Sequence, residues 1–451
     1  MPHRPAAPEP RMGQALKVAI VGAGWAGLAA AVEVTQAGHI ATIFEASNAI
    51  GGRARALDCF LPDGTPVTLD NGQHILIGAY TETLRLMTQV GLQPSDMLLD
   101  LPMMLQFPDG QGIRFPDWPT PLDALGGILR APGWTWADKW AMLRCATRWQ
   151  WQGFQCDSSL SVAELCQPLT ARVLDELIEP LCVSALNTPA NQASASVFLR
   201  VLRDALFGIA RGSHLLLPKT DLSSLFPQTA ASWVTQRGGQ LHLTSRVTAI
   251  EPADVGWQVH GELFDAVILA TSASNATLVL AGYAHSAITS IASDILNWTG
   301  KAQALHFEAI ATVYAFAPDA SLHQPMLALR SSAQAPAQFV FDRGRLGGPK
   351  GLLAFVVSAS HGDRVTLQAQ VLQQAQSQLG LTLQAVQTVV EKRATFACVP
   401  NMQRPPAWIA PGLFACGDYV AGPYPATLEG AVRSGLAAGA SVSVARRTPR
   451  Q

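Results

Sequence analysis

The sequence predicts an α/β fold in which a domain built on a parallel sheet is interrupted by an inserted α+β domain. Three observations favour this fold. An apolar run, a glycine-rich turn and an Ala-rich segment follow one another near the N-terminus. Short strand-like runs return after residue 238, and the chain ends with an apolar run, a Gly-Asp pair and a helical segment. Strands and helices that alternate in this way form parallel sheets covered by helices.

The N-terminal unit combines a strand, a tight turn and a helix. Residues 18–21 are an apolar run that predicts a buried strand, and the Ala-rich residues 26–37 predict a helix. Gly22, Gly24 and Gly27 lie between them with the G-x-G-x-x-G spacing. In this motif the first glycine permits a tight turn, the second lets the backbone approach a pyrophosphate, and the third lets the helix pack closely on the strand. Because the helix start also offers free N–H groups to phosphates, the unit predicts a bound dinucleotide.

The residues that follow this unit indicate which dinucleotide binds. Residues 40–44 predict a second strand, which ends at Glu45, where an acid accepts hydrogen bonds from ribose hydroxyls. Gly51, Gly52 and Arg53 come next, and a guanidinium in this place can pair with the pyrophosphate. This glycine pair with its basic residue resembles the FAD-containing amine oxidase and phytoene desaturase superfamily. The resemblance implies a Rossmann-like FAD-binding domain and favours FAD over NAD.

Composition narrows the classes of partner. The 451 residues can form two or three domains' worth of core. Charged residues make up 14%, below the roughly 25% usual for soluble domains. The net charge of −1 argues against a nucleic-acid partner. The high apolar share is compatible with an apolar substrate cavity, with a protein that rests on a membrane, and equally with a large core.

Cysteines and apolar runs bear on the location of the protein. Seven cysteines without a C-x-x-C pair predict reduced thiols in the cytoplasm and argue against a metal site or a disulfide framework. The longest uncharged apolar run, residues 18–32, is shorter than the ~20 residues that cross a bilayer. Residues 1–16 are rich in proline, lack the apolar centre of a signal peptide, and predict a disordered tail.

A polar turn, residues 70–74, follows the strand predicted over residues 65–70. Its Gly72 again permits close approach of the backbone to a ligand. On these residues alone, an ordinary turn at a strand end remains the alternative. Residues 69–87 resemble the bacterial hydroxysqualene dehydroxylases, which are FAD enzymes of hopanoid synthesis. The resemblance implies that this segment passes beside the flavin ring, so that Gln73 and His74 face the substrate.

Residues 117–151 are unusually rich in tryptophan and are interleaved with arginine and lysine. Six of the eleven tryptophans of the chain lie here: Trp118, Trp134, Trp136, Trp140, Trp149 and Trp151. Tryptophan rings with cations suit the headgroup layer of a membrane, which predicts peripheral membrane association. The alternative is a helix pair in the substrate domain whose tryptophans line the core.

The domain organisation follows from where the strand pattern stops and resumes. Short strands are predicted at 241–243, 246–250, 257–260 and 264–270, and again at 309–316, 339–341 and 352–358, with a helix over 367–379. We expect a tail (1–16), a discontinuous FAD-binding domain (17–75, 215–300 and 395–451) and a substrate-binding domain (76–214 and 301–394). Residues 179–189 and 214–228 also resemble the hydroxysqualene dehydroxylases, and Val247 matches the superfamily position whose backbone touches adenine. Amine oxidases of the superfamily place a lysine near the flavin, but no lysine lies between Lys301 and Lys350.

The C-terminal segment predicts the second half of the cofactor site. An apolar run, residues 413–416, ends at Gly417 and Asp418, and the Asp418 carboxylate can accept hydrogen bonds from ribityl hydroxyls. A helix that starts near Thr427 directs its positive end at the flavin pyrimidine. The Gly-Asp pair and residues 429–435 match the closing motif of the superfamily. The complete set of predicted cofactor-binding residues is Gly22, Ala23, Gly24, Ala26, Gly27, Glu45, Ala46, Gly52, Arg53, Gly72, Gln73, Val247, Gly417, Asp418, Thr427, Leu428 and Ala431.

The resemblance to hydroxysqualene dehydroxylases extends from residue 18 to residue 435. It implies reductive removal of the hydroxyl of hydroxysqualene, which needs a flavin, a proton source and a dry apolar tunnel for the triterpene. His74 is the predicted proton donor because the usual pKa of histidine suits acid–base work, with Gln73 beside it and Glu429 and Tyr424 as reserves. Alternatively, His74 only packs on the flavin or hydrogen-bonds to it.

The source of electrons and the direction of their flow are separate questions. The chain has no second strand–GxGxxG–helix unit, so we expect an external electron donor. Local motifs do not distinguish hydride donation from hydride removal, so a carotenoid desaturase or isomerase is the alternative function. A flavoprotein that carries polyprenoids without turnover is a third interpretation.

Overall fold

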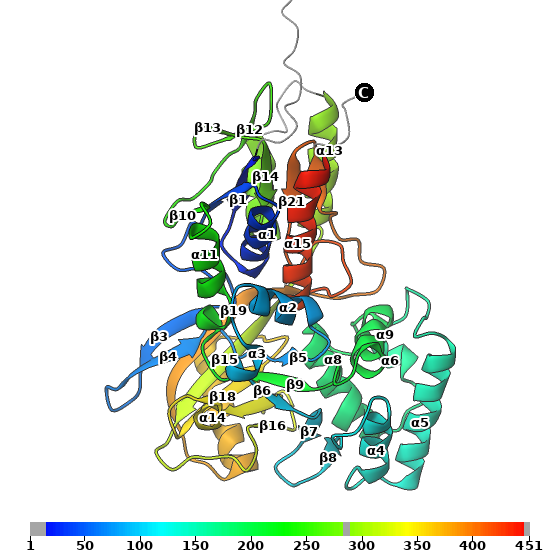
Figure 1. Cartoon of the computed structure of the whole chain (residues 1–451). Coiled ribbons are helices and arrows are strands. Elements are labelled where there is room, and N and C mark those ends of the chain that lie inside the picture. The colour runs from blue at the N-terminus through cyan, green and yellow to red at the C-terminus, as the bar shows by residue number, and fades with distance from the viewer. Residues whose placement is uncertain (1–14, 283–288, 446–451) are drawn as a thin grey trace, which may run out of the picture.

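A parallel sheet occupies one end of the molecule (Figure 1). A computed structural model describes residues 15–282 and 289–445. Among these residues, six strands form the sheet, and all neighbours are parallel except the last pair, β21 and β20. In spatial order the strands are β10 (Gln240–His242), β2 (Ile40–Phe44), β1 (Lys17–Val21), β14 (Ala266–Leu269), β21 (Leu413–Ala415) and β20 (Trp408–Ala410). The carboxyl ends of the parallel strands therefore meet at one edge.

Two long helices pack against each other on the parallel sheet. They are α1 (Trp25–Gln36), which follows β1, and α15 (Leu428–Ala445), which ends the described chain. A Cβ placed on Gly435 would lie 2.1 Å from the carbonyl oxygen of Ala26, so glycine is required where these helices meet. The other elements of this end are α10 (Leu222–Leu225), α11 (Pro227–Thr235), α12 (Ala273–Leu280), α13 (Thr289–Gln303), β11 (Glu251–Pro252), β12 (Trp257–Val259) and β13 (Glu262–Phe264).

An antiparallel sheet lies in the lower left part of Figure 1. Its strands, in spatial order, are β16 (Met326–Ala328), β17 (Phe339–Asp342), β18 (Leu352–Val357), β15 (Phe307–Phe316) and β19 (Gln384–Phe396). Helix α14 (Arg364–Leu379) covers one face, where Val313 and Phe355 pack with Val371. Because side chains alternate along a strand, the next residues along the same strands, Thr312 and Val356, point to the opposite face of the sheet.

Helices and short strands connect the two sheets and fill the remaining corner. The strands are β3 (Ala56–Phe60), β4 (Pro66–Asp70), β5 (Leu76–Ile77), β6 (Leu98–Leu101), β7 (Met104–Gln106), β8 (Gly112–Arg114) and β9 (Leu215–Pro218). The helices are α2 (Thr81–Gln89), α3 (Pro94–Met97), α4 (Leu122–Arg130), α5 (Trp136–Trp151), α6 (Val162–Leu165), α7 (Ala171–Val173), η1 (Leu174–Ile178), α8 (Glu179–Leu186), α9 (Ala195–Arg203), η2 (Asp204–Gly208) and η4 (Arg343–Leu346). Figure 1 shows α4, α5, α6, α8 and α9 gathered at the corner far from β1.

Most predicted elements are confirmed within a few residues, and two differences stand out. Residues 246–250 were predicted as a strand but form no regular element, and the strand nearby is β11 at Glu251–Pro252. The long strand β19 was not predicted, because the charged residues 391–393 interrupt its apolar alternation. Of the predicted tail, residues 1–14 lie outside the described residues, whereas Leu16 is buried and its carbonyl accepts the N–H of Ile40.

Candidate flavin-binding site

A cavity of about 880 Å³ lies at the carboxyl ends of the parallel strands. Gly22, Glu45, Ala270 and Gly417 line it, and each closely follows the end of a different strand, β1, β2, β14 or β21. Strand β1 lies between β2 and β14, so successive βα connections leave it in opposite directions. Ligands of doubly wound sheets bind at such a switch point. The volume falls in the usual range for small-molecule sites.

The three glycines of the N-terminal motif have three different environments. A Cβ on Gly22 would lie 2.7 Å from the carbonyl oxygen of Ala270, and the φ of Gly22 is +114°, so the tight turn requires glycine. A Cβ on Gly27 would lie 2.0 Å from the carbonyl oxygen of Gly22, which is the close helix–strand contact. A Cβ on Gly24, by contrast, would meet no protein atom nearer than the Cα of Gly52 at 3.8 Å.

Gly24 supplies the test of whether the cavity fits a dinucleotide. Its φ of −76° is accessible to any residue, so neither backbone conformation nor protein packing requires glycine there. The space that a side chain would occupy opens into the cavity at the start of α1. A pyrophosphate placed against this backbone would meet the N–H groups of the helix start. The residues present therefore fit the diphosphate of FAD.

Glu45 and Arg53 are held by the protein itself. The Glu45 carboxylate accepts the backbone N–H groups of Ala23 and Ser47, each at 2.8 Å, and Glu45 lines the cavity. The Arg53 guanidinium donates to the Asp418 carboxylate and to the backbone carbonyl of Ala394. Arg53 and Asp418, which were expected to bind different parts of the cofactor, thus form an ion pair with each other. This pair ties the N-terminal motif to the C-terminal motif.

The start of α15 faces the cavity. Thr427 caps this helix, since its hydroxyl accepts the N–H of Gly430 at 2.9 Å. Thr427, Leu428 and Ala431, three of the predicted cofactor-binding residues, line the cavity. The positive end of the α15 dipole therefore borders the cavity.

His74 lies in the cavity wall beside Gly72. Its Nδ1 lies 2.9 Å from the Gly72 carbonyl oxygen, and because a carbonyl only accepts, Nδ1 carries the hydrogen. Burial lowers the pKa of His74 below its ordinary value, and the nearby Arg53 charge acts in the same direction. The imidazole is therefore neutral near pH 7, with Nε2 as a hydrogen-bond acceptor.

The neighbouring Gln73 is held from both sides. Its amide oxygen accepts a hydrogen bond from the Arg343 guanidinium at 3.1 Å, and its amide N–H donates to the His74 carbonyl at 3.2 Å. Its backbone N–H donates to the Thr312 hydroxyl. Gln73 thus lines the cavity with its side chain already fixed by the protein.

The part of the cavity away from the glycines has an apolar wall. The strands of the antiparallel sheet contribute Ile310, Phe339, Phe341, Val356 and Val389, and α8 contributes Val183 and Ala185. Among the described residues that line the cavity there is no lysine. Thr312, on the predicted strand where superfamily amine oxidases were expected to place lysine, carries a hydroxyl. This region can hold an apolar molecule next to a flavin.

Two of the predicted catalytic residues lie elsewhere. Glu429 is fully buried outside the cavity lining, and its carboxylate accepts the backbone N–H groups of Glu82 and Thr83 at the start of α2 and pairs with Arg433. It holds α2 on α15 and has no free position toward a substrate. The Tyr424 ring lies under the Arg433 guanidinium, also outside the lining, and burial raises its pKa to about 12. Neither arrangement suits a proton donor for a substrate in the cavity.

Most of the predicted cofactor residues line the cavity together, but two do not. Ala23 and Gly27 lie behind the turn, where Ala23 holds Glu45 and Gly27 packs against Gly22. The sequence reasoning missed the contribution of β19, whose residues Arg393 and Thr395 line the cavity. No motif marks them, since they reach the site only through the pairing of β19 with β15.

Comparisons with known proteins agree with this geometry. The family model described as flavin containing amine oxidoreductase matches residues 25–443. An oxidoreductase from Methanosarcina mazei has a similar structure, with a TM-score of 0.68 at 15% identity over 94% of this chain and 99% of its own. Cyclohexylamine oxidase from Brevibacterium oxydans superimposes with a TM-score of 0.66 at 16% identity, covering 96% of this chain and 99% of its own. The predicted α/β fold is confirmed.

Relatives of known name fall into two groups. Hydroxysqualene dehydroxylase from Zymomonas mobilis is 26% identical, over 93% of this chain and 97% of its own length. The enzyme of the same name from Rhodopseudomonas palustris is also 26% identical, over 95% and 99%. The 15-cis-phytoene desaturase of Arabidopsis thaliana is 27% identical over only 55% of this chain and 45% of its own. The chain belongs to the flavin containing amine oxidoreductase family and is an FAD-dependent oxidoreductase.

Proposed function

We propose that this enzyme removes the hydroxyl of hydroxysqualene reductively and yields squalene. The observation that carries the proposal is the cavity itself, which continues from the nucleotide cradle to an apolar wall without lysine. Such a wall suits a triterpene better than an amine. The nearly full-length similarity to hydroxysqualene dehydroxylases supports the same substrate class.

The reaction exchanges a C–O bond for a C–H bond. Reduced FAD supplies a hydride when it is bound in the cavity. The hydroxyl leaves with one proton as water, and the adjacent double bond delocalises the positive charge that remains on carbon. Two electrons and a proton must then reach the flavin from an external donor, because the chain contains no second dinucleotide-binding unit. The apolar wall excludes water, which would otherwise return a hydroxyl to the cation.

The chain's own residues orient the substrate and supply the proton. We propose that His74 hydrogen-bonds the departing hydroxyl through Nε2, since Nδ1 is engaged by Gly72. For His74 to act as the acid, Nε2 must first be protonated, and the lowered pKa restricts that form to mildly acidic solution. Gln73, fixed by Arg343, shapes the wall next to it.

This role of His74 predicts a definite pH dependence. In the enzyme saturated with substrate, the turnover number should fall as pH rises, with a midpoint below the ordinary histidine pKa of ~6.5. In His74→Ala this fall of turnover with rising pH should disappear, and the turnover number at acidic pH should be lower than in the parent by about 100-fold or more. The flavin spectrum should stay that of the parent. An unchanged pH profile and rate in this variant would mean that His74 only packs beside the flavin.

The direction of electron flow has a direct test. Chemically reduced holoprotein, incubated without oxygen with hydroxysqualene, should form one squalene per flavin as the flavin is reoxidised. The partial similarity to phytoene desaturase favours a carotenoid desaturase or isomerase as the second candidate. That enzyme would leave hydroxysqualene untouched, and its oxidised form would instead bleach on addition of phytoene, or isomerise a carotenoid without net redox change.

The proposal also includes the cellular location of the enzyme and the boundaries of its two domains. The seven cysteines carry free thiols, which supports a cytoplasmic enzyme that meets its lipophilic substrate at the inner face of the membrane. In the described ranges, no helix has both the length and the apolar character needed to cross a bilayer. We assign 17–75, 215–300 and 395–451 to FAD binding, since the six strands of the parallel sheet come from them, and 76–214 and 301–394 to the substrate.

A further inference from the structure

Helix α4 presents an apolar stripe to solvent. Leu122, Leu125 and Leu129 are 53%, 40% and 42% exposed, and their spacing of three and four residues places them on one side of the helix. The acidic side chain of the same helix, Asp123, is buried instead and accepts a hydrogen bond from Ser213. A helix of a soluble protein has the opposite arrangement, with its apolar stripe facing the core.

Helix α5 adds exposed tryptophans to this surface. Trp136, Trp140 and Trp151 are 69%, 67% and 87% exposed, and they lie on the same side of α5. Trp134 and Trp149 face inward, and the Trp134 indole donates to the buried Glu176. The core interpretation of this segment is therefore confirmed for Trp134 and Trp149, whereas Trp136, Trp140 and Trp151 face solvent.

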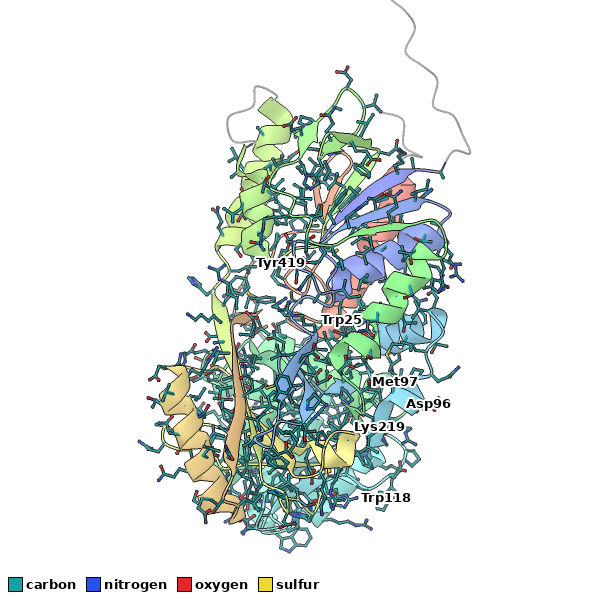
Figure 2. The ribbon with its side chains drawn as sticks, turned by 90° about the vertical axis from the view of Figure 1, so that its left-hand side faces the viewer. Trp25, Asp96, Met97, Trp118, Lys219 and Tyr419 are labelled. Atoms are coloured by element: carbon teal, nitrogen blue, oxygen red, sulfur yellow. The ribbon has the colours of Figure 1, made fainter. Side chains whose placement is uncertain are left out.

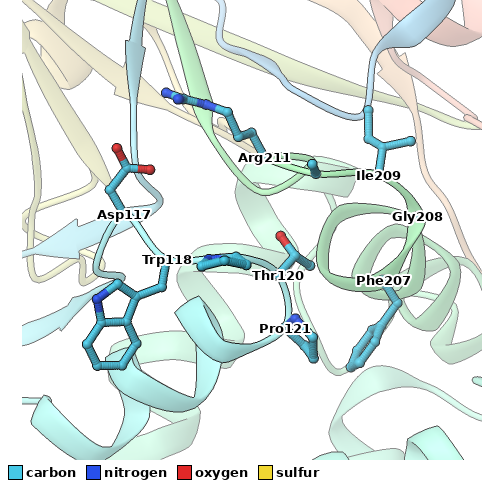
Figure 3. A pocket seen from close by; sticks show the side chains of 10 residues that line it. Asp117, Trp118, Thr120, Pro121, Phe207, Gly208, Ile209 and Arg211 are labelled. Carbon is cyan, nitrogen blue, oxygen red and sulfur yellow. The ribbon is translucent and has the colours of Figure 1, made fainter.

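A third group of apolar side chains borders a second cavity of about 540 Å³ (Figure 3). Segment 117–121 forms one side of this cavity and segment 207–211 the other. Trp118, Phe207 and Ile209 are each about two-fifths exposed. The Phe207 ring contacts Phe154 just beyond α5, which joins the cavity to the helices. We call the exposed side chains of α4 and α5, with Trp118, Phe207 and Ile209, the tryptophan face.

The tryptophan face lies far from the parallel sheet. Figure 2 shows Trp118 near the lower end of the molecule, well below Tyr419, and Figure 1 shows α4 and α5 in the same lower part. Half of the large apolar side chains that are exposed among the described residues belong to this face. Scattered apolar residues on a surface are ordinary, but a concentration of this kind marks an interaction site.

The exposed charges of helices α4 and α5 are of one sign, whereas Asp117, an exposed acid beside Trp118, borders the second cavity. Residues 118–152 contain four cations, Arg130, Lys139, Arg144 and Arg148, and none of the four pairs with an acid in the described part of the chain. Arg130 and Lys139 lie over the rings of Trp118 and Trp136. The acids of this stretch, Asp123 and Asp138, are both buried, and Asp138 caps α5.

These charges distinguish the candidates for what covers the face. A second copy of the chain, docked about a two-fold axis, would place cations against cations with no exposed acid of residues 118–152 between them. An anionic lipid surface complements the cations, and indole rings are stable in its headgroup layer. We propose that the tryptophan face docks the enzyme on a bilayer that contains anionic phospholipids. The docking proposal rests on the proposed function in one respect only, namely the purpose of docking, which is to collect a lipid substrate from the bilayer.

The test measures binding of full-length FAD-loaded protein to sedimented vesicles. Vesicles of equal parts phosphatidylcholine and phosphatidylglycerol should retain the protein, whereas phosphatidylcholine alone should retain at least about tenfold less. Trp136→Ser/Trp140→Ser and Arg144→Glu/Arg148→Glu should each lower binding to the mixed vesicles at least about tenfold. Trp408→Ser, which removes another exposed tryptophan, and Arg364→Glu, which reverses a cation on α14, should bind like the parent.

Several outcomes would overturn the docking proposal. Equal binding of the parent to both vesicle types, no binding at all, or parental binding by both paired variants would do so. A parent that sediments as a dimer in solution and becomes monomeric in Trp136→Ser/Trp140→Ser would make the face a protein interface instead. Turnover of hydroxysqualene in detergent is measured separately, so failure of the docking proposal and failure of the proposed reaction give different results.

Discussion

Replacing Gly24 by alanine is expected to weaken flavin binding by about 100-fold or more while the flavin-free protein keeps its stability. The added Cβ meets no protein atom within 3.8 Å, and the φ of −76° suits alanine. The free energy of unfolding of the apoprotein should therefore stay within about 1 kcal/mol of the parent, as glycine and alanine differ only modestly at a helix start. The methyl group occupies the space in which backbone and pyrophosphate must come together.

Gly27→Ala is the matched control because it adds the same methyl group three residues away. Here the Cβ would lie 2.0 Å from the carbonyl oxygen of Gly22, so the helix or the turn must move. We expect a loss of about 1–3 kcal/mol in the unfolding free energy of the apoprotein, as for other overpacked cores. Urea unfolding of both apoproteins, with FAD titration followed by fluorescence, separates the two effects. If Gly24→Ala binds FAD like the parent, the cradle assigned to the pyrophosphate is wrong.

The N-terminal part of the cavity could be predicted from the sequence because its residues are close together in the chain. Gly22, Gly24, Gly27 and Glu45 lie within one continuous βαβ unit, so their spacing along the chain determines their spacing in the structure. The same holds for Gly417, Asp418 and the start of α15. Local sequence therefore specified both segments that meet at the cavity, although almost four hundred residues separate them.

Glu429 shows where this reasoning fails. Its motif identified the correct helix, but the orientation of a side chain on a helix depends on what packs there. In the structure that neighbour is α2, whose first N–H groups the carboxylate accepts. No spacing within residues 424–435 reveals this contact, because the partners lie more than three hundred positions earlier in the chain.

The sequence-based predictions for the tryptophan-rich segment and for strand β19 were incomplete for a related reason. The pattern of residues 117–151 predicted two different environments, and it could not separate the inward Trp149 from the outward Trp151. That separation depends on which side of α5 packs against the rest of the domain. Strand β19 carries charged residues because part of it borders the cofactor cavity, so its sequence lacks the apolar alternation of a buried strand.

A second large effect is expected at a residue that sequence reasoning placed only at the edge of the site. Asp70 is 1% exposed, and one of its carboxylate oxygens accepts the backbone N–H of Leu222 at 2.8 Å. The other faces the Arg343 guanidinium at 3.6 Å, and Arg343 is itself buried and holds the Gln73 amide. Asp70→Ala leaves the Arg343 charge buried without its carboxylate, so we expect a loss of about 3–5 kcal/mol in the free energy of unfolding.

The pair also makes stability depend on pH in a specific direction. Burial raises the pKa of Asp70 from 3.8 to about 6, although the Arg343 charge opposes the rise. The folded protein therefore binds more protons at this site than the unfolded chain between about pH 4 and pH 6. Stability contributed by Asp70 is present at low pH and falls, by about 3 kcal/mol, as pH rises through that window. Asp70→Asn should lack this component, which is obtained as the difference between the two stability–pH curves.

The double variant Asp70→Asn/Arg343→Met decides whether the ion pair or the individual side chains matter. Removal of both charges avoids an unpaired buried ion, so the double variant should be more stable than Asp70→Asn and should show an interaction energy of at least about 1 kcal/mol in the cycle with the single variants Asp70→Asn and Arg343→Met. Because Arg343 also fixes Gln73, flavin affinity should fall in this variant even where stability recovers. Additive effects on the free energy of unfolding would show that Asp70 stabilises the protein only through its hydrogen bond with Leu222. Flavin affinity equal to that of the parent would show that the Asp70–Arg343 pair has no effect on the cofactor site.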